Sequence, residues 1–248
     1  MTGRWAANLA TLANALVGLG AIAYTLAGNP LWGMLLIVCG LGFDGLDGYL
    51  SRRSGLPPSA FGRVADSVAD AVTFGLAPAA LVIVHTERAA LWAPWQSDAV
   101  IVGVLIAALA FARLVYFTLR AFRVPHFVGA PTPQNALAVA ALVLFLDVPG
   151  FLGTDPIAFL LGSGLVALTM VVPVPFPKVR RGSRVRLPAT VTSVALVVAL
   201  VPLQFRPAPG SWPFLVAEAA AVVAAAGIAF YYLAGPFLVP RGGTAVSE

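Results

Sequence analysis

Four aspartates lie close together in a sequence that otherwise contains few acids. Asp44, Asp47, Asp66 and Asp70 are four of only ten acidic residues in a chain of 248. The first two are spaced i, i+3 and the last two i, i+4, so each pair would share one face of a helix. Oxygen ligands of this kind favour Mg²⁺, Mn²⁺ or Ca²⁺ over zinc or copper. The four carboxylates therefore indicate a divalent-metal site.

The elements that must position these acids are hydrophobic helices. Hydrophobic residues make up 60% of the chain and charged residues only 10%, with a mean hydropathy of +0.92. This composition excludes an ordinary soluble domain, and apolar runs of about 20 residues can each cross a bilayer core of roughly 30 Å. The sequence thus predicts an all-α integral membrane protein. Cys39 is the only cysteine, which excludes an internal disulfide and a thiolate metal cluster.

Eight transmembrane helices are expected from apolar runs that are separated by charged residues, Pro and Gly. They fall at about residues 6–27, 31–50, 62–84, 99–120, 134–150, 156–173, 188–204 and 212–235. The connections are short, so we expect a single domain over residues 1–248. A short loop also makes the second and third helices antiparallel neighbours, which would bring the two aspartate pairs to one cavity.

The charge distribution predicts an orientation. An even number of helices puts both termini on the same side of the membrane. Of the 15 Lys and Arg residues, all but Arg88 and Arg206 fall on that side, and cytoplasmic loops carry an excess of these residues. We therefore expect a multi-pass protein of the cell (plasma) membrane with both termini and the aspartates at the cytoplasmic face. The net charge of +5 reflects topology and attraction to anionic membrane lipids, so no nucleic acid partner is expected.

Residues beside the aspartates suit a phosphate-bearing substrate. Gly48 and Gly62 remove side chains where a bulky ligand could approach the backbone closely. Arg52 supplies a permanent positive charge that suits phosphate. Metal, arginine and open backbone together favour a substrate that contains pyrophosphate. Acids within membrane helices can instead conduct protons or ions, or pair with arginine, and the spacing alone leaves this alternative open.

The same residues match a family motif. The pattern D-x-x-D-G-x-x-A-R…G-x-x-x-D-x-x-x-D is typical of the CDP-alcohol phosphatidyltransferases, and the chain resembles them at seven of its eight fixed positions. The matching residues are Asp44, Asp47, Gly48, Arg52, Gly62, Asp66 and Asp70. Ser51 stands where the family has alanine, and nine residues instead of eight separate Arg52 from Gly62. Serine is also small and the extra residue lies in a loop, so neither departure weakens the resemblance.

Further segments are similar to the membrane-integral phosphatidylserine synthase subfamily. They are residues 11–14, 66–78, 112–114, 129–133 and 172–178. The resemblance therefore covers about residues 8–180, which we expect to form the catalytic core. The last two expected helices, within residues 188–235, are additional and rest only on the helix count of the subfamily.

This resemblance implies transfer of a phosphatidyl or archaetidyl group from a CDP-linked lipid to the hydroxyl of L-serine, with release of CMP. It implies Mg²⁺ or Mn²⁺ as the cofactor and a homodimer as the assembly. Asp70 is implied both as a metal ligand and as the base that takes the hydroxyl proton. The other implied metal ligands are Asp44, Asp47 and Asp66. The residues implied for CDP-lipid binding are Gly48, Ser51, Arg52, Gly62, Thr11 and Asn14.

Serine as an acceptor needs a cation for its carboxylate. Arg113 and Arg120 lie on the same side as the aspartates, and Arg113 also lies in a subfamily-like segment, so both are candidate acceptor-binding residues. Basic residues at the membrane surface also anchor proteins to anionic headgroups, which is the alternative for Arg120 and for the basic cluster at 178–186. That cluster also keeps an inositol phosphate or glycerol phosphate acceptor open. An ion-coupled transporter is a more distant alternative, because nearly all charge lies at one face and not through the bilayer midplane.

Overall fold

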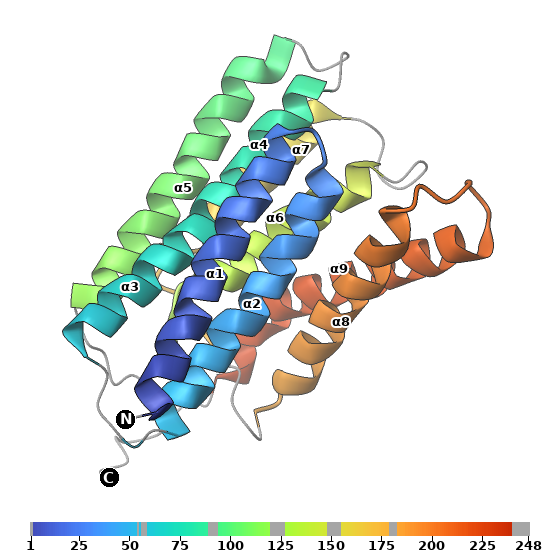
Figure 1. The fold of residues 1–248 in the computed structure, drawn as a ribbon. Coiled ribbons are helices and arrows are strands. Elements are labelled where there is room, and N and C mark those ends of the chain that lie inside the picture. The colour runs from blue at the N-terminus through green and yellow to red at the C-terminus, as the bar shows by residue number, and fades with distance from the viewer. Residues whose placement is uncertain are drawn as a thin grey trace.

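Long apolar helices form most of the computed structural model, which describes residues 2–53, 55, 59–88, 94–119, 127–147, 155–178 and 183–239. The first half contains α1 (Thr2–Leu26), α2 (Pro30–Arg53), α3 (Ala60–Asp70), the π-helix η1 (Ala71–Leu76), α4 (Ala77–Arg88) and α5 (Gln96–Leu119). The second half contains α6 (Thr132–Asp147), α7 (Pro156–Leu168), α8 (Arg186–Leu203), α9 (Trp212–Ala234) and the 3-10 turn η3 (Gly235–Leu238). Because α3, η1 and α4 continue as one rod, eight helical rods of the described chain lie where eight helices are predicted (Figure 1).

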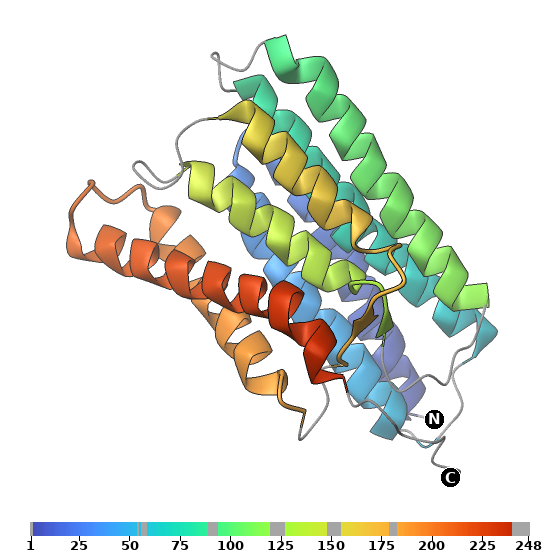
Figure 2. The ribbon, with the colours of Figure 1, turned by 180° about the vertical axis from the view of Figure 1, so that it is seen from behind.

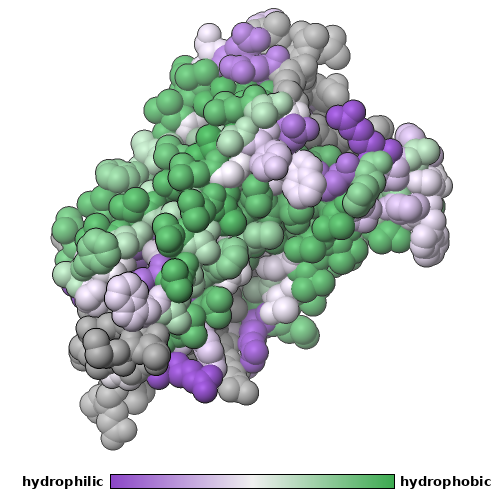
Figure 3. Space-filling view, in the orientation of Figure 1, coloured by the Kyte–Doolittle hydropathy of each residue, from purple (hydrophilic) through white to green (hydrophobic). Residues whose placement is uncertain are grey.

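Six of these rods are long and apolar enough to cross a bilayer, within the residues that the structure describes. They run over Trp5–Leu26, Pro30–Arg53, Ala60–Glu87, Gln96–Leu119, Arg186–Leu203 and Trp212–Leu238. The shorter α6 and α7 have 16 and 13 residues, and at a rise of about 1.5 Å per residue neither reaches roughly 30 Å. The fold is thus mainly helical and of the multi-pass membrane type, and hydrophobic side chains cover most of the face seen in Figure 3.

Helix α6 lies inside the bundle, which explains how a short apolar helix is accommodated. Its residues Leu137, Val139, Val143 and Leu144 are almost completely buried. The helix contacts α4, α7 and α9, and Figure 2 shows it between α7 and α9. A helix that is hydrophobic on all sides needs apolar neighbours all round. For α6 these neighbours are other helices, so its length need not match the thickness of a bilayer.

The π-helix η1 begins directly after Asp70. Short π turns inside α-helices are rare and occur frequently at functional sites. The hydroxyl of Thr73 in η1 donates to the carbonyl of Asn14 at 2.8 Å. Gly18 of α1 and Gly40 of α2 lie directly against Thr73, where a side chain on either glycine would collide with it. These contacts fix α1, α2 and the third rod relative to one another beside the aspartates.

The structure contains a small antiparallel ribbon that the sequence does not predict. Strand β1 (Phe127–Val128) pairs with β2 (Pro175–Phe176), with Phe127 opposite Phe176. Gly129 follows β1 with a φ of 76°, in the left-handed region that glycine adopts without strain. The ribbon is a local exception to the all-α prediction. It brings the segment before α6 and the segment after α7 side by side.

Candidate active site

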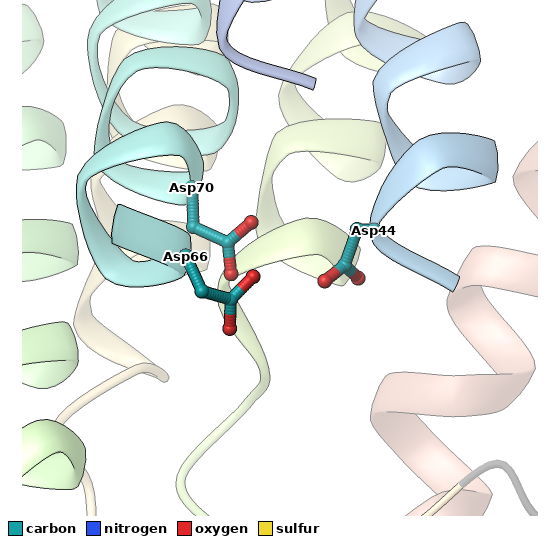
Figure 4. Close-up of side chains that lie close together, drawn as sticks. All are labelled: Asp44, Asp66 and Asp70. Atoms are coloured by element: carbon teal, nitrogen blue, oxygen red, sulfur yellow. The ribbon is translucent and has the colours of Figure 1, made fainter. Parts of the chain in front are cut away.

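Three of the four aspartates come together between α2 and α3. One carboxylate oxygen from each of Asp44, Asp66 and Asp70 lies within 4.8 Å of the other two. Figure 4 shows the side chains of Asp66 and Asp70 on one helix pointing towards Asp44 on the other. Ser59 accepts a hydrogen bond from the Gly62 amide at 2.9 Å, and this cap fixes where α3 begins. The structure therefore places three of the predicted metal ligands in one group.

Asp47 lies one turn further along α2 and contacts helix α1. Its buried carboxylate accepts a hydrogen bond from the Thr11 hydroxyl at 2.9 Å. It also neighbours the carboxyl of Asp66. Asp47 thus lies beside the group of three but is not part of it. Its role as a metal ligand stays a prediction.

Asn14 of α1 orients Asp70. Its fully buried side chain donates from Nδ2 to Oδ1 of Asp70 at 3.0 Å. The resemblance implies that Thr11 and Asn14 bind the CDP-lipid, whereas in the structure the side chain of each donates a hydrogen bond to an aspartate. Helix α1 therefore holds two of the four carboxylates in fixed orientations.

The donor set suits a hard divalent cation. All three close ligands are carboxylates, and Oδ1 of Asp66 is buried without a hydrogen-bond partner among the residues that the structure describes. Carboxylates this close repel one another, and burial removes the water that would otherwise solvate them. Mg²⁺ and Mn²⁺ prefer oxygen ligands. Either ion would offset the repulsion and give the unpaired Asp66 oxygen a partner.

A cavity of about 1050 Å³ opens beside the three aspartates. Asp44, Asp66 and Asp70 line its acidic end. Another part of the lining, which we call the Arg113 end, comes from α5, the ribbon and the start of α6. It includes Arg113, Phe117, Phe127, Thr132, Gln134 and Lys178. The lining thus combines the aspartates with cations, among them Arg52, Arg113 and Lys178, and the cavity can hold a charged substrate that is much larger than a single ion.

Arg113 of α5 is a buried cation with unused donors. Its side chain is 7% exposed, and its Nη1 donates to the Thr132 hydroxyl at 3.1 Å. The guanidinium carbon lies 4.5 Å from the ring centre of Phe117 and 5.6 Å from that of Phe127, within the range of cation–π attraction. Nε and Nη2 have no hydrogen-bond partner in the described part of the chain. Leaving such groups unpaired in a buried site is costly, so the arrangement favours an anionic ligand here.

The other residues predicted to bind substrate are placed as follows. The Arg52 side chain lines the cavity. Its guanidinium lies close to Gly48, since a Cβ added at Gly48 would be 3.3 Å from the Nη1 atom of Arg52. Gly62 uses its amide in the helix cap, and Ser51 is half-buried near the end of α2. Arg120 lies outside the residues that the structure describes. Arg52 is thus positioned to meet a phosphate group in the cavity.

Most residues of the Arg113 end belong to no recognisable sequence motif. The residues missed from the sequence are Phe117, Phe127, Thr132 and Gln134. From the sequence, Lys178 is expected to anchor the protein to lipid headgroups. In the structure it lines the cavity, and its Nζ lies 5.2 Å from the ring centre of Phe127. For Thr132 and Lys178 the signal is the pair of subfamily-like segments at 129–133 and 172–178, whereas Phe117, Phe127 and Gln134 lie outside these segments. The two segments are far apart in sequence, and the ribbon brings them together.

The chain is similar to a known protein family and to several individual relatives. A family model described as CDP-alcohol phosphatidyltransferase matches residues 4–175. The chain is 28% identical to the archaetidylserine synthase of Methanothermobacter thermautotrophicus over 173 residues, and this alignment covers 69% of each of the two chains. It is 31% identical over 169 residues to the CDP-diacylglycerol–serine O-phosphatidyltransferase of Methanocaldococcus jannaschii, covering 68% of this chain and 71% of the relative. The enzyme with the same name from Bacillus subtilis is 29% identical over 176 residues, covering 69% of this chain and 89% of the relative.

Proposed function

Because the chain belongs to the CDP-alcohol phosphatidyltransferase family, we propose that it transfers a phosphatidyl or archaetidyl group from a CDP-linked lipid to the hydroxyl of L-serine, releasing CMP. The observation that carries the choice of serine is the buried Arg113, which shares one cavity with the aspartates. Relatives named as serine phosphatidyltransferases and as an archaetidylserine synthase support the same acceptor.

Arg113 is suited to the carboxylate of an amino acid. Its unpaired Nε and Nη2 lie along one edge of the guanidinium, the edge with which arginine donates two parallel hydrogen bonds to a carboxylate. The third nitrogen, Nη1, is held by the Thr132 hydroxyl. Arg113 would therefore fix the carboxylate of serine at one end of the cavity, leaving the hydroxyl to reach towards Asp70.

Asp70 has the position of a general base for the transfer step. In this step the seryl oxygen bonds to the β-phosphorus of the CDP-lipid, while the bond from that phosphorus to the oxygen of the departing CMP breaks. The hydroxyl proton passes to the Asp70 carboxylate, and the electron pair of the broken bond leaves with CMP. Asn14 holds Oδ1 of Asp70 at 3.0 Å, which keeps the carboxylate in a constant orientation for this proton transfer.

We assign Asp44, Asp66 and Asp70 as the closest metal ligands, with Asp47 beside them. When bound, Mg²⁺ or Mn²⁺ would neutralise charge on the pyrophosphate and on the departing CMP. Arg52 lines the same part of the cavity and would add a fixed positive charge there. Binding of the CDP group thus rests on α2 and α3, and binding of the acceptor on α5.

The membrane placement is part of the proposal. We place all eight rods in the cell membrane, with the cavity and both termini at the cytoplasmic face and the catalytic core in residues 8–180. The support is the bias of Arg and Lys towards that side in the sequence. A water-soluble acceptor such as serine would then enter directly from the cytoplasm.

A phosphate-bearing acceptor is the second candidate, and Lys178 favours it. Lys178 gives the Arg113 end a second cation, with its Nζ 5.2 Å from the ring centre of Phe127. Inositol phosphate and glycerol phosphate carry more negative charge than serine and could use both cations.

The deciding experiment is CMP release from CDP-linked lipid in purified membranes that contain the protein. L-serine, inositol phosphate and glycerol phosphate are offered separately, and membranes without the protein serve as the blank. We expect release to depend on L-serine. Release without any acceptor, or a clear preference for one of the phosphates, would overturn the serine assignment.

Replacing Asp44 by asparagine is expected to weaken metal-dependent binding of the CDP-lipid. The change removes one charged ligand, and even residues that only orient a ligand typically contribute about 10–100-fold to metal affinity. The measurement is the Mg²⁺ or Mn²⁺ concentration that gives half-maximal CDP-lipid binding, which should rise at least about tenfold. Asp98 is exposed in the first turn of α5 and Asp98→Asn is the matched control. Binding that is the same with and without divalent metal would refute the metal site.

A further inference from the structure

Helix α9 lies beyond the family match at residues 4–175, yet it contacts the segment that carries Lys178. Phe176 of β2 stacks on Tyr231 of α9, with ring centres 5.6 Å apart and planes at 22°. Its ring also meets Tyr232 edge-on at 6.0 Å. The Tyr231 hydroxyl donates to the carbonyl of Pro177 at 3.2 Å. Tyr231 therefore holds the two residues directly before Lys178.

The ribbon connects this aromatic contact to Arg113. Phe176 is the pairing partner of Phe127 across the two strands. The Phe127 ring centre lies 5.6 Å from the guanidinium carbon of Arg113 and 5.2 Å from Nζ of Lys178. A continuous series of contacts thus runs from Tyr231 through the ribbon to both cations at the Arg113 end of the cavity.

The other end of the ribbon is fixed by the backbone. The Gly129 amide donates a hydrogen bond to the Val174 carbonyl at 2.9 Å. The Ala130 amide donates to the Thr169 carbonyl at 2.8 Å. A side chain at Gly129 would collide with the carbonyl of Met170, so the two segments can approach this closely only with glycine there. These bonds determine where the following Thr132 lies.

A second tyrosine links α9 to the same region. Asn135 of α6 donates from Nδ2 to the Tyr232 hydroxyl at 3.4 Å and to the carbonyl of Val166. Asn135 lies one turn after Thr132, the residue that accepts from Arg113. Helix α9 therefore contacts both the ribbon and the first turn of α6, and each of these two elements also contacts the Arg113 guanidinium.

From these contacts we infer that α9 positions the acceptor site, with Tyr231 as the positioning residue that acts through Phe176 and Pro177 on Phe127 and Lys178. This inference rests on the proposed function, because it takes the Arg113 end as the place where the acceptor's anionic group binds. It gives the last helix a role in the reaction, although the matched family region ends before that helix. The acidic end is held by α1, α2 and α3, so α9 should affect acceptor binding and leave CDP-lipid binding unchanged.

The test is a steady-state comparison of Tyr231→Ala and Tyr231→Phe with the wild-type protein in membranes. The alanine variant loses both the ring stack and the hydrogen bond, and its KM for L-serine should rise about tenfold. Its kcat and its KM for the CDP-lipid should stay within about twofold of wild type, because misplacement is confined to the acceptor. The phenylalanine variant keeps the stack and should recover most of the affinity. Phe230→Ala is the matched control, since Phe230 is the preceding aromatic residue of α9 and is 40% exposed.

Two outcomes would overturn the inference. One is an unchanged KM for L-serine in Tyr231→Ala; the other is an equal change in both KM values and kcat, which a merely structural role would produce. If the alanine variant does not fold, Tyr231→Phe decides, because loss of the Pro177 hydrogen bond alone should still raise the KM for the acceptor more than that for the CDP-lipid. Failure of the proposed function looks different: wild-type protein would then prefer another acceptor, and the same comparison would be made with that acceptor.

Discussion

Asp70→Asn is expected to lower CMP release by about 10²–10⁴-fold, the usual contribution of a general base. Asparagine has nearly the same shape as aspartate, and its oxygen can still accept the hydrogen bond that Asn14 donates to Oδ1 at 3.0 Å. It cannot take a proton from the acceptor hydroxyl at neutral pH. Asp70 lines the cavity and is 9% exposed, so bulk water has limited access to replace it as a base.

The measurement pairs single-turnover CMP release with equilibrium binding of the CDP-lipid in the presence of Mg²⁺. The variant should bind the lipid while failing to turn it over, and Asp98→Asn, exposed on α5, should behave as wild type in both assays. Turnover close to that of wild type would remove Asp70 from the base role. Loss of CDP-lipid binding together with turnover would show that Asp70 acts mainly as a metal ligand.

The acidic end of the cavity could be predicted from sequence because its signals are local. Spacings of i, i+3 and i, i+4 put each aspartate pair on one helix face, and a short loop makes α2 and α3 neighbours. Which three acids come closest could not be predicted, because this depends on how the two helices are rotated about their axes. That rotation is set by contacts far apart in sequence, such as Thr11 with Asp47 and Asn14 with Asp70.

The helices could be predicted from apolar runs, but their surroundings could not. Hydropathy marks α6 as strongly as it marks the longer helices, because lipid tails and packed side chains are both apolar. The structure places α6 among α4, α7 and α9, and it has only 16 residues. The hydropathy pattern therefore predicts eight helices, but it does not show which of them are long enough to cross a bilayer.

The Arg113 end depends on contacts between segments that are distant in the chain. Strands of two residues are too short to show an alternating pattern, and Phe127 pairs with Phe176 only after α6 and α7 have packed. Arg113 could be predicted because it lies in a subfamily-like segment. Its burial, its bond to Thr132 and the role of Tyr231 could not, because each depends on a partner from another helix.

Arg113→Gln is expected to raise the KM for L-serine on the order of 10²-fold or more, because removing one partner of a buried, hydrogen-bonded charge pair typically costs about 2–5 kcal/mol. Glutamine is shorter than arginine, has no positive charge and lacks the two-nitrogen edge that Nε and Nη2 provide. The KM for the CDP-lipid should stay within about twofold, since that substrate is bound at the acidic end of the cavity. The measurement is CMP release with each substrate varied in turn.

Two further variants separate charge from geometry in this result. Arg113→Lys keeps the charge and loses the paired donors, so its KM for L-serine should lie between those of wild type and Arg113→Gln. Arg184→Gln removes an exposed positive charge near the start of α8 and should leave both KM values unchanged. If Arg113→Gln raises the KM for the CDP-lipid as much as that for L-serine, the guanidinium acts on the pyrophosphate or on the aspartates. The acceptor's anion would then have to be bound by Lys178, the other described cation that lines this end of the cavity.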